Sequence, residues 1–236
     1  MSIKNNNNLL EDKYNLLSEL GSGSFGSVFR AEDIRTKKEY AIKVEDKNSK
    51  SRLKNEYDIY RKLKKTVVYG IPRVKKYFES EGRCFMLMQL LGKSLDYWVS
   101  KSEYAFDLAT VLKLGINIIN LLESVHSAGY LHRDIKPNNF LIGYEDDDIS
   151  NIYIMDFGLS KKYLDSKGKH IPYRDGKSLV GTARYASINV HKGIEPSRRD
   201  DLESVGYMLL YFLFKKLPWQ GLKKKQDTDH TNDWSV

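Results

Sequence analysis

His132-Arg133-Asp134-Ile135-Lys136-Pro137-Asn138-Asn139 decides the fold, together with Asp156-Phe157-Gly158, which begins 17 positions after Asn139. The carboxylate of Asp134 can accept the proton of a substrate hydroxyl, and Lys136 is spaced to reach a terminal phosphate. Asn139 and Asp156 carry hard oxygen donors that suit Mg²⁺. A single aspartate is usually a solvated loop residue, but the joint spacing predicts a phosphoryl-transfer site.

A glycine-rich turn is expected between two strands near the start of the chain. It reads Gly21-Ser22-Gly23-Ser24-Phe25-Gly26-Ser27-Val28, and the flanking strands are Tyr14–Leu20 and Ser27–Ala31. Glycines let backbone amides approach phosphate oxygens without obstruction by Cβ atoms. An ordinary hairpin is the alternative. A dinucleotide-binding fold would need a helix directly after the turn, whereas this sequence continues as a strand.

A lysine lies on the inner face of the next predicted strand, Glu39–Glu45, where Ala41 and Lys43 share one face. A buried lysine is costly unless a carboxylate pairs with it. Glu56 is the natural partner, because it lies 13 residues further on in a predicted helix, Ser51–Lys65. The pair would hold Lys43 against the α- and β-phosphates of a nucleotide. The alternative is a surface Lys–Glu pair.

The character of the chain changes near residue 90. Before it, strands surround a single helix, and the last two strands are Val74–Phe78 and Cys84–Leu90. After it, apolar residues recur at helical spacing. We therefore predict an α+β fold with a disordered segment at 1–12 and a domain at 13–225. The domain would have an antiparallel-sheet lobe at 13–90 and a mainly helical lobe at 91–225, before a polar tail at 226–236.

Two long helices are predicted in the second lobe. Asp107 is a good N-cap for the first, and Gly129 ends it. One apolar stripe is expected along this helix: Leu108, Val111, Leu112, Ile118, Ile119, Leu122 and Val125. Pro196 begins the second helix, in which Val205–Phe214 is apolar on every side. Such a helix belongs inside a lobe.

Composition limits the partners and the location. Lys and Arg number 39 against 31 Asp and Glu, so the formal net charge is +8, which suits phosphate ligands and acidic peptides. The longest lysine run, Lys223–Lys225, is too short for a nucleic-acid-binding arm, and we expect no nucleic acid partner. One cysteine, Cys84, excludes an internal disulfide. A basic nucleic-acid-binding module remains the third-ranked alternative.

No targeting or membrane segment is expected. The N-terminus, with Asn5–Asn8, lacks the apolar core of a signal peptide. The longest apolar run, Val205–Phe214, is shorter than the about 20 residues that span a bilayer. These features predict a cytoplasmic or nuclear protein without a membrane segment.

Basic residues flank the predicted catalytic stretch. They are Arg133, Lys161, Lys177 and Arg184. Guanidinium and ammonium groups that cluster form an anion pocket, and we expect this one to bind acidic or phosphorylated substrates. Ordinary surface charge is the alternative.

Taken together, these residues resemble the eukaryotic protein kinases, and more particularly the casein kinase 1 family. The particular resemblance rests on the end of the activation segment and on the flanks of the apolar helix. The matching stretches run at 170–174 (HIPYR), 181–189 (GTARYASIN), 197–204 (SRRDDLES) and 217–222 (LPWQGL). The Ser187-Ile188-Asn189 motif stands where other protein kinases have Ala-Pro-Glu. The resemblance extends from about Tyr14 to Lys225.

The resemblance implies a bilobal serine/threonine kinase that binds ATP and Mg²⁺ between its lobes. It implies that Met88 closes the back of the ATP pocket, that Gln89–Leu91 form the hinge, and that Asp201 fixes the catalytic loop. It implies acidic or already phosphorylated protein substrates and activity without phosphorylation of the activation segment. The residues that would line the nucleotide are Leu20, Gly21, Ser22, Gly23, Ser24, Phe25, Gly26, Ser27, Val28, Ala41, Lys43, Met88, Gln89 and Leu91.

The resemblance also divides the basic residues between two family anion sites. Arg133, Lys161 and Lys177 match one of them, and Arg184, Gln220 and Gly221 match part of the other.

Three departures from the family pattern stand out. Asn138 replaces an aspartate, Gln89 replaces an acid, and the match ends after Lys225, so that the last C-lobe helices are absent. Loss of those helices predicts exposure of side chains from the apolar helix, and a partner that covers this face. It also keeps open the alternative of an ATP-binding pseudokinase or regulatory fragment that the missing C-lobe end disables.

Overall fold

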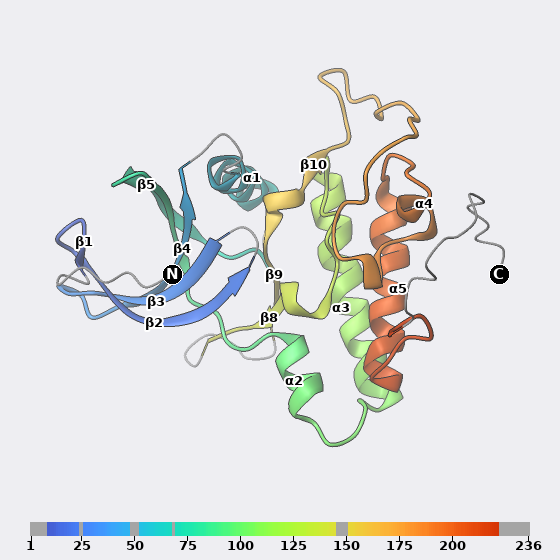
Figure 1. The fold of residues 1–236 in the computed structure, drawn as a ribbon, viewed down its shortest axis with the longest axis horizontal. Helices are drawn as coiled ribbons and strands as arrows, with labels where there is room; N and C mark the ends of the chain where they lie inside the picture. The colour runs from blue at the N-terminus through green and yellow to red at the C-terminus, as the bar shows by residue number, and fades with distance from the viewer. Residues whose placement is uncertain (1–8, 24–25, 48–51, 68, 145–150, 222–236) are drawn as a thin grey trace, which may run out of the picture.

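A computed structural model describes residues 9–23, 26–47, 52–67, 69–144 and 151–221. Figure 1 shows two lobes side by side: a curled sheet with helix α1 (Leu53–Thr66), and a second lobe in which helices α3 (Leu108–Ser127) and α5 (Arg198–Phe214) run alongside each other. The predicted α+β architecture is confirmed. The predicted tail at 226–236 lies outside the described residues.

The first lobe is built on a six-stranded sheet in which every pair of neighbours is antiparallel. The strand order is β1-β2-β3-β4-β6-β5. The strands are β1 (Leu9–Leu10), β2 (Tyr14–Gly23), β3 (Gly26–Asp33), β4 (Glu39–Asp46), β5 (Val74–Ser80) and β6 (Arg83–Gln89). The sequence pattern predicts disorder throughout 1–12. Leu9 and Leu10 instead pair with Asn15 and Tyr14, because β2 has a free edge there.

The core of this lobe consists of two hydrophobic clusters, because the side chains of β4 and β6 alternate between the two faces of the sheet. Ile42 and Val44 lie in one cluster with Phe85, whereas Ala41 lies in the other with Met86. Successive side chains of a strand point to opposite faces, so the predicted separation of Ile42 from Ala41 and Lys43 is confirmed. Lys43 thus faces the same side as Ala41.

Helix α1 (Leu53–Thr66) covers the face of the sheet that carries Lys43. It buries Leu53, Ile59, Tyr60 and Leu63 in the same cluster as Ala41. Its first amides have no cap from Arg52; the carboxylate of Glu45, on β4, accepts from the amides of Arg52 and Leu53 instead. The helix start is therefore fixed to the strand that carries Lys43.

The second lobe is mainly helical. Asp107 is the N-cap of helix α3, as predicted, because its carboxylate accepts a hydrogen bond from the Thr110 amide. The helices are α2 (Leu95–Lys101), α3 (Leu108–Ser127), α4 (Ile188–His191) and α5 (Arg198–Phe214). Short strands and turns lie between them: β7 (Tyr130–Leu131), η1 (Pro137–Asn139), β8 (Phe140–Ile142), β9 (Ile152–Ile154), η2 (Phe157–Leu159), β10 (Lys161–Lys162) and η3 (Ala183–Tyr185).

The apolar stripe predicted for α3 is partly wrong. Val111, Ile118, Leu122 and Val125 are buried. The other three predicted members, Leu108, Leu112 and Ile119, are exposed. At 100° per residue, positions 112 and 119 lie one step around the helix from 111 and 118, on a side of α3 that the rest of the lobe leaves exposed.

Helix α3 also has the length and composition of a membrane span. The buried row of α3 belongs to the main hydrophobic core, together with Val205, Met208 and Phe212 of α5. In this fold α3 is therefore a core helix of the second lobe.

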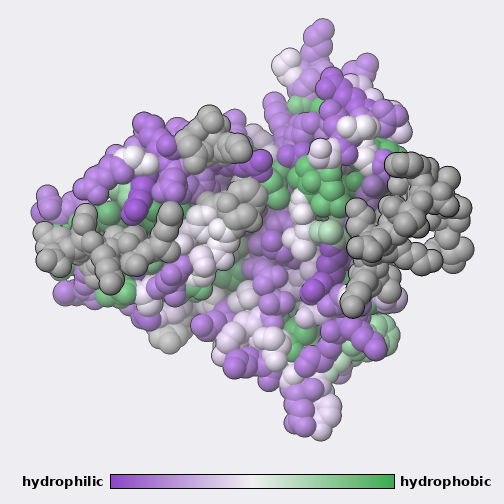
Figure 2. Space-filling model, viewed as in Figure 1, coloured by the Kyte–Doolittle hydropathy of each residue, from purple (hydrophilic) through white to green (hydrophobic). Residues whose placement is uncertain are grey.

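Helix α5 is buried on one side only. Val205, Met208 and Phe212 are buried inside the lobe, as the apolar pattern predicts, whereas Leu210 is 43% and Phe214 is 64% exposed, in agreement with the predicted exposure of side chains from this helix. A binding partner for this side remains a proposal. On the face drawn in Figure 2 the surface is mainly hydrophilic, with apolar residues in small separate patches.

Candidate active site

The glycine-rich turn connects β2 to β3. Gly23 pairs with Gly26 and Gly21 pairs with Val28 across this hairpin. A Cβ atom on Gly26 would overlap the carbonyl oxygen of Val44, and φ at Gly26 is +128°, so this position requires glycine. Around Gly21 and Gly23 the space for a Cβ is open, which leaves the backbone free to approach a phosphate. The predicted contacts Ser24 and Phe25 lie outside the described residues.

Lys43 joins three parts of the chain. Its Nζ lies 2.7 Å from Oε2 of Glu56 on α1 and 3.0 Å from Oδ1 of Asp156. The lysine and Glu56 are both buried, and the other oxygen of Glu56, Oε1, has no hydrogen-bond partner among the described residues. The structure thus brings together three residues that the sequence separates by 113 positions.

Burial alone does not decide the pKa shifts of Lys43, Glu56 and Asp156. Burial raises the pKa of Glu56 to about 7, although Lys43 attracts its carboxylate. Burial also acts to raise the pKa of Asp156, but the attraction of Lys43 outweighs it and the net pKa is lowered. Burial acts to lower the pKa of Lys43, yet the two carboxylates raise it above its usual range. At neutral pH, Lys43 is therefore a cation and Asp156 an anion.

Aromatic contacts connect α1 to the loop that carries Asp134. The hydroxyl of Tyr60 accepts a hydrogen bond of 2.9 Å from the amide of Asp156. The ring of Phe157 is buried, with its centroid 5.0 Å from that of Tyr60 and 5.1 Å from that of His132. Asp156 itself has a positive φ of 67°, and these contacts stabilise that less favourable backbone conformation.

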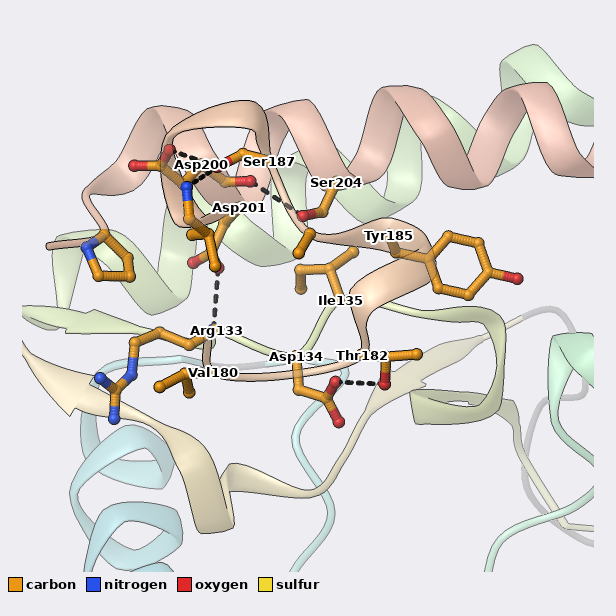
Figure 3. A pocket seen from close by; sticks show the side chains of 13 residues that line it. Arg133, Asp134, Ile135, Val180, Thr182, Tyr185, Ser187, Asp200, Asp201 and Ser204 are labelled. Atoms are coloured by element: carbon orange, nitrogen blue, oxygen red, sulfur yellow. Dashed lines mark hydrogen bonds between the residues drawn. The ribbon is translucent and has the colours of Figure 1, made fainter. Parts of the chain in front are cut away.

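The carboxylate of Asp134 is held by several donors. Oδ1 accepts a bond of 2.8 Å from the hydroxyl of Thr182, and Oδ2 lies 2.7 Å from Nζ of Lys136. Nζ of Lys136 also donates to the Thr182 hydroxyl at 3.2 Å. Figure 3 shows Asp134 and Thr182 pointing toward each other beside a pocket that the start of α5 also lines. Asp134 is buried at 6% exposure, so its position is fixed.

Asp201 on α5 fixes the backbone next to Asp134, as the resemblance implies. Its carboxylate accepts from the amides of His132 and Arg133, each at 2.9 Å, and pairs with the ring of His126 at 2.8 Å. Arg133 has a positive φ of 68°, and the two hydrogen bonds stabilise this conformation. The predicted anchor is confirmed.

The residues predicted to line the nucleotide base come from neighbouring strands. The register pairs Val28 with Lys43 and Ala41 with Met88. Met88 is buried, whereas Gln89 and Leu91, at the predicted hinge, are partly exposed. The remaining predicted contacts are on β2 and β3: Leu20, which is exposed, and Ser22 and Ser27, which face each other across the hairpin.

Asn139 and Asp156 offer oxygen atoms that suit Mg²⁺. The amide nitrogen of Asn139 donates to the backbone carbonyl of Asp134 at 2.8 Å, which leaves its side-chain oxygen as a ligand atom. Asp156 uses Oδ1 for Lys43, which leaves Oδ2. The described residues contain no cluster of three or more His, Cys, Asp and Glu side chains that could hold a metal. The donor set therefore fits a cation that completes its shell with phosphate and water oxygens.

The four predicted anion-site residues make different contacts. Lys161 and Lys177 face the carboxylate of Glu195 at 2.7 and 3.9 Å. Arg133 donates from Nε to the carbonyl of Leu159 at 2.7 Å. The guanidinium of Arg184 lies 5.9 Å from the ring centroid of Tyr185. A pocket that combines these four residues stays a prediction.

Three residues of this site had no role in the sequence prediction: Tyr60, Thr182 and Glu195. Tyr60 reads as one apolar position of a helix, and Glu195 reads as a loop acid. Thr182 stands within a motif stretch but carries no spacing signal of its own. Only the folded backbone brings their polar atoms to Asp156, Asp134 and Lys161.

The sequence matches the protein kinase domain family over residues 14–234. The chain belongs to the protein kinase family. The kinase domain implies ATP as phosphate donor and protein as acceptor. The match continues past Lys225, where the resemblance predicts the domain to end, and that boundary stays a prediction.

Proposed function

We propose that this chain is a serine/threonine kinase of the casein kinase 1 type, which transfers the γ-phosphate of ATP to acidic or already phosphorylated proteins. The observation that carries this proposal is the fixed carboxylate of Asp134, buried and hydrogen-bonded to Thr182 next to the ammonium of Lys136. A base in this environment can take a hydroxyl proton while a cation faces the phosphate that is being transferred.

The transfer follows from these positions. The substrate hydroxyl oxygen forms a bond to the γ-phosphorus, the bond from that phosphorus to the β-phosphate oxygen breaks, and ADP leaves. Asp134 accepts the hydroxyl proton. Lys43 neutralises charge on the α- and β-phosphates, and Lys136 neutralises charge on the γ-phosphate. Asn139 and Asp156 would hold Mg²⁺, which supplies further charge neutralisation of the phosphates.

Two features support the substrate class. Lys136, two residues after Asp134, is typical of kinases that phosphorylate serine and threonine. The side chains of Lys177 and Arg184 are exposed on the segment that continues to Tyr185, where they could meet an acidic or phosphorylated substrate. Arg133 and Lys161 are less accessible, because Leu159 and Glu195 engage them.

The test is a phosphotransfer assay with Mg²⁺, radiolabelled ATP and a set of peptides. The peptides share one acidic sequence and differ only in the acceptor, which is serine, threonine or tyrosine, with or without an upstream phosphoserine. We expect transfer to serine and threonine only, and a fall of about 10²–10⁴-fold in Asp134→Asn. ATP binding without transfer by the wild-type chain would identify a pseudokinase instead.

A matched control separates loss of chemistry from loss of folding. Asp165→Asn changes an aspartate whose carboxylate accepts only from the amides of its own turn, Lys167 and Lys169, among the described contacts. This variant should keep wild-type transfer. Equal loss in both variants would contradict the role assigned to Asp134.

A further inference from the structure

A tyrosine of the second lobe contacts an ion pair of the first lobe beside the predicted hinge. Arg30 on β3 binds Glu39 on β4 with two hydrogen bonds, from Nε to Oε1 at 2.8 Å and from Nη2 to Oε2 at 2.7 Å. Nη2 also donates to the hydroxyl of Tyr144 at 3.0 Å, and that hydroxyl donates to Oε2 of Glu39 at 3.2 Å. The three side chains thus form a closed ring of hydrogen bonds, although Tyr144 follows Glu39 by 105 positions.

The ion pair lies on the face of the sheet that carries the predicted nucleotide contacts. Arg30 is the register partner of Ala41, and directly opposed residues of an antiparallel pair share a face. Val28, two residues before Arg30, packs against the core cluster that contains Ala41. A partly exposed ion pair adds little to the stability of two strands that are already hydrogen-bonded. Its distinctive contact is therefore the one with Tyr144.

Tyr144 is held in place by the chain that leaves the hinge. It lies two residues after the end of β8. The amide of Gly92 donates to the carbonyl of Ile142 at 3.0 Å, and the amide of Ile142 donates to the carbonyl of Lys93 at 3.2 Å. A Cβ atom on Gly92 would lie 2.6 Å from the carbonyl oxygen of Gly143, so the two backbones are in close contact just before Tyr144. The chain after β8 runs toward the strands of the first lobe (Figure 1).

The contact connects the two lobes and can open reversibly. Arg30 lowers the pKa of Glu39, so both partners of the tyrosine hydroxyl are charged, and charge-assisted hydrogen bonds are the stronger ones. The side chains of Arg30 and Glu39 are 38% and 25% exposed, so water can replace the hydroxyl. Release of a nucleotide from between two lobes requires them to move apart, and that motion would break the hydrogen bonds of Tyr144.

We propose that Tyr144 is a positioning residue: together with Arg30 and Glu39 it forms a lobe latch beside the hinge, which holds the two lobes together and slows the release of nucleotide. Tyr144 touches no reacting atom and acts through the ion pair. The inference rests on the proposed function, because phosphotransfer needs nucleotide between the lobes, but it does not depend on which protein is phosphorylated.

The test measures how fast the fluorescent nucleotide mant-ADP leaves the protein in the presence of Mg²⁺ and excess unlabelled ADP. Tyr144→Phe removes the hydroxyl and keeps the ring, whose centroid lies 5.9 Å from the guanidinium carbon of Arg30. We expect the dissociation rate in stopped flow to rise about threefold to tenfold, as the loss of one hydrogen bond predicts. The KM for the peptide substrate should not change. Tyr104→Phe is the matched control, because its ring is 74% exposed, and it should keep the wild-type rate.

A second background shows whether the hydroxyl acts through the ion pair. Arg30→Leu with Glu39→Leu removes both charges together and leaves neither unpaired. In this background Tyr144→Phe should change the dissociation rate by less than about twofold. The control background is Glu11→Leu with Lys76→Leu, which removes an ion pair of similar exposure within the first lobe. There Tyr144→Phe should keep its full effect.

Several results would overturn the proposal. These are release of mant-ADP from Tyr144→Phe at the wild-type rate, equal acceleration in Tyr104→Phe, and a full effect of Tyr144→Phe in the background without Arg30 and Glu39. A parallel rise in the KM for peptide would also overturn it, because it would indicate a general loosening of the fold. Failure of the proposed function is distinguishable: a wild-type chain that binds mant-ADP but transfers no phosphate would refute that function, while the dissociation rates would still test the lobe latch.

Discussion

Two buried glutamates, Glu56 and Glu195, each have a lysine ammonium at 2.7 Å. Their carboxylates nevertheless differ in charge. The pKa of Glu56 is raised to about 7, chiefly by burial, whereas that of Glu195 is lowered because the attraction of its cations exceeds the effect of burial. Burial and a lysine neighbour alone therefore do not decide the charge of an acid.

The difference lies in the other charges nearby. Glu56 shares Lys43 with Asp156, and the negative charges of Asp156 and Glu45 both raise its pKa further. Glu195 is instead surrounded by the charges of Lys161, Lys177 and Arg133, and each of them lowers its pKa. A lysine that two acids hold can also face a nucleotide phosphate, because it keeps a carboxylate partner when it does so. A carboxylate held by several cations is instead suited to a static structural contact.

The largest expected effect comes from removing the lysine of each pair. Lys43→Met should lower phosphotransfer by about a hundredfold or more, because it removes the cation that faces the nucleotide phosphates. Lys161→Met should lower it by only about tenfold, because Lys177 and Arg133 still neutralise Glu195. Initial rates at saturating ATP and peptide measure the loss in each variant. Equal losses would contradict the different roles assigned to the two pairs.

The pH dependence of stability should separate the glutamates next. Glu56 has a folded-state pKa above its usual 4.5, so its contribution is fully present below about pH 4.5 and is lost as the pH rises through about 7. The free energy of unfolding of the wild-type chain should therefore fall relative to Glu56→Gln by about 1–3 kcal/mol over this range. Urea titrations at several pH values measure it; a flat difference would mean that Glu56 stays ionised.

Glu195 should show the opposite sign. Its folded-state pKa is lowered from 4.5, so its contribution is present above pH 4.5 and is lost as the pH falls through the folded-state value. The stability advantage of the wild-type chain over Glu195→Gln should thus shrink only below about pH 4.5. The same titrations, extended to acid pH, provide the measurement. An advantage that shrinks between pH 5 and 7 would contradict the lowered pKa.

The smallest expected effect concerns Glu45. Its carboxylate caps α1 and adds negative charge near Glu56. Glu45→Gln keeps an oxygen for the cap but removes the charge, so the stability transition assigned to Glu56 should move to lower pH. The change in stability at pH 5 should stay within about 1 kcal/mol. A transition that does not move would show that the charge of Glu45 does not act on Glu56.

Sequence patterns predicted the strands and most helices well, because period 2 and period 3.6 are local properties. They were less successful with α3, where Leu108, Leu112 and Ile119 read as core and are exposed. Apolarity marks candidates for burial, but only a packed neighbour decides which row of a helix is covered. Likewise, the sequence pattern marked Lys161 and Lys177 as candidates, but it did not mark Glu195, the acid that both of them face.

The sequence by itself determined the kinase chemistry, since the residue types and spacings around Asp134, Asp156, Lys43 and the glycine turn are local and specific. Only the tertiary structure decided which polar atoms meet: Thr182 with Asp134, Tyr60 with Asp156, and Glu195 with Lys161. The physical reason is that a side chain's charge and hydrogen bonds depend on neighbours in space. Those neighbours come from segments that no local spacing rule connects.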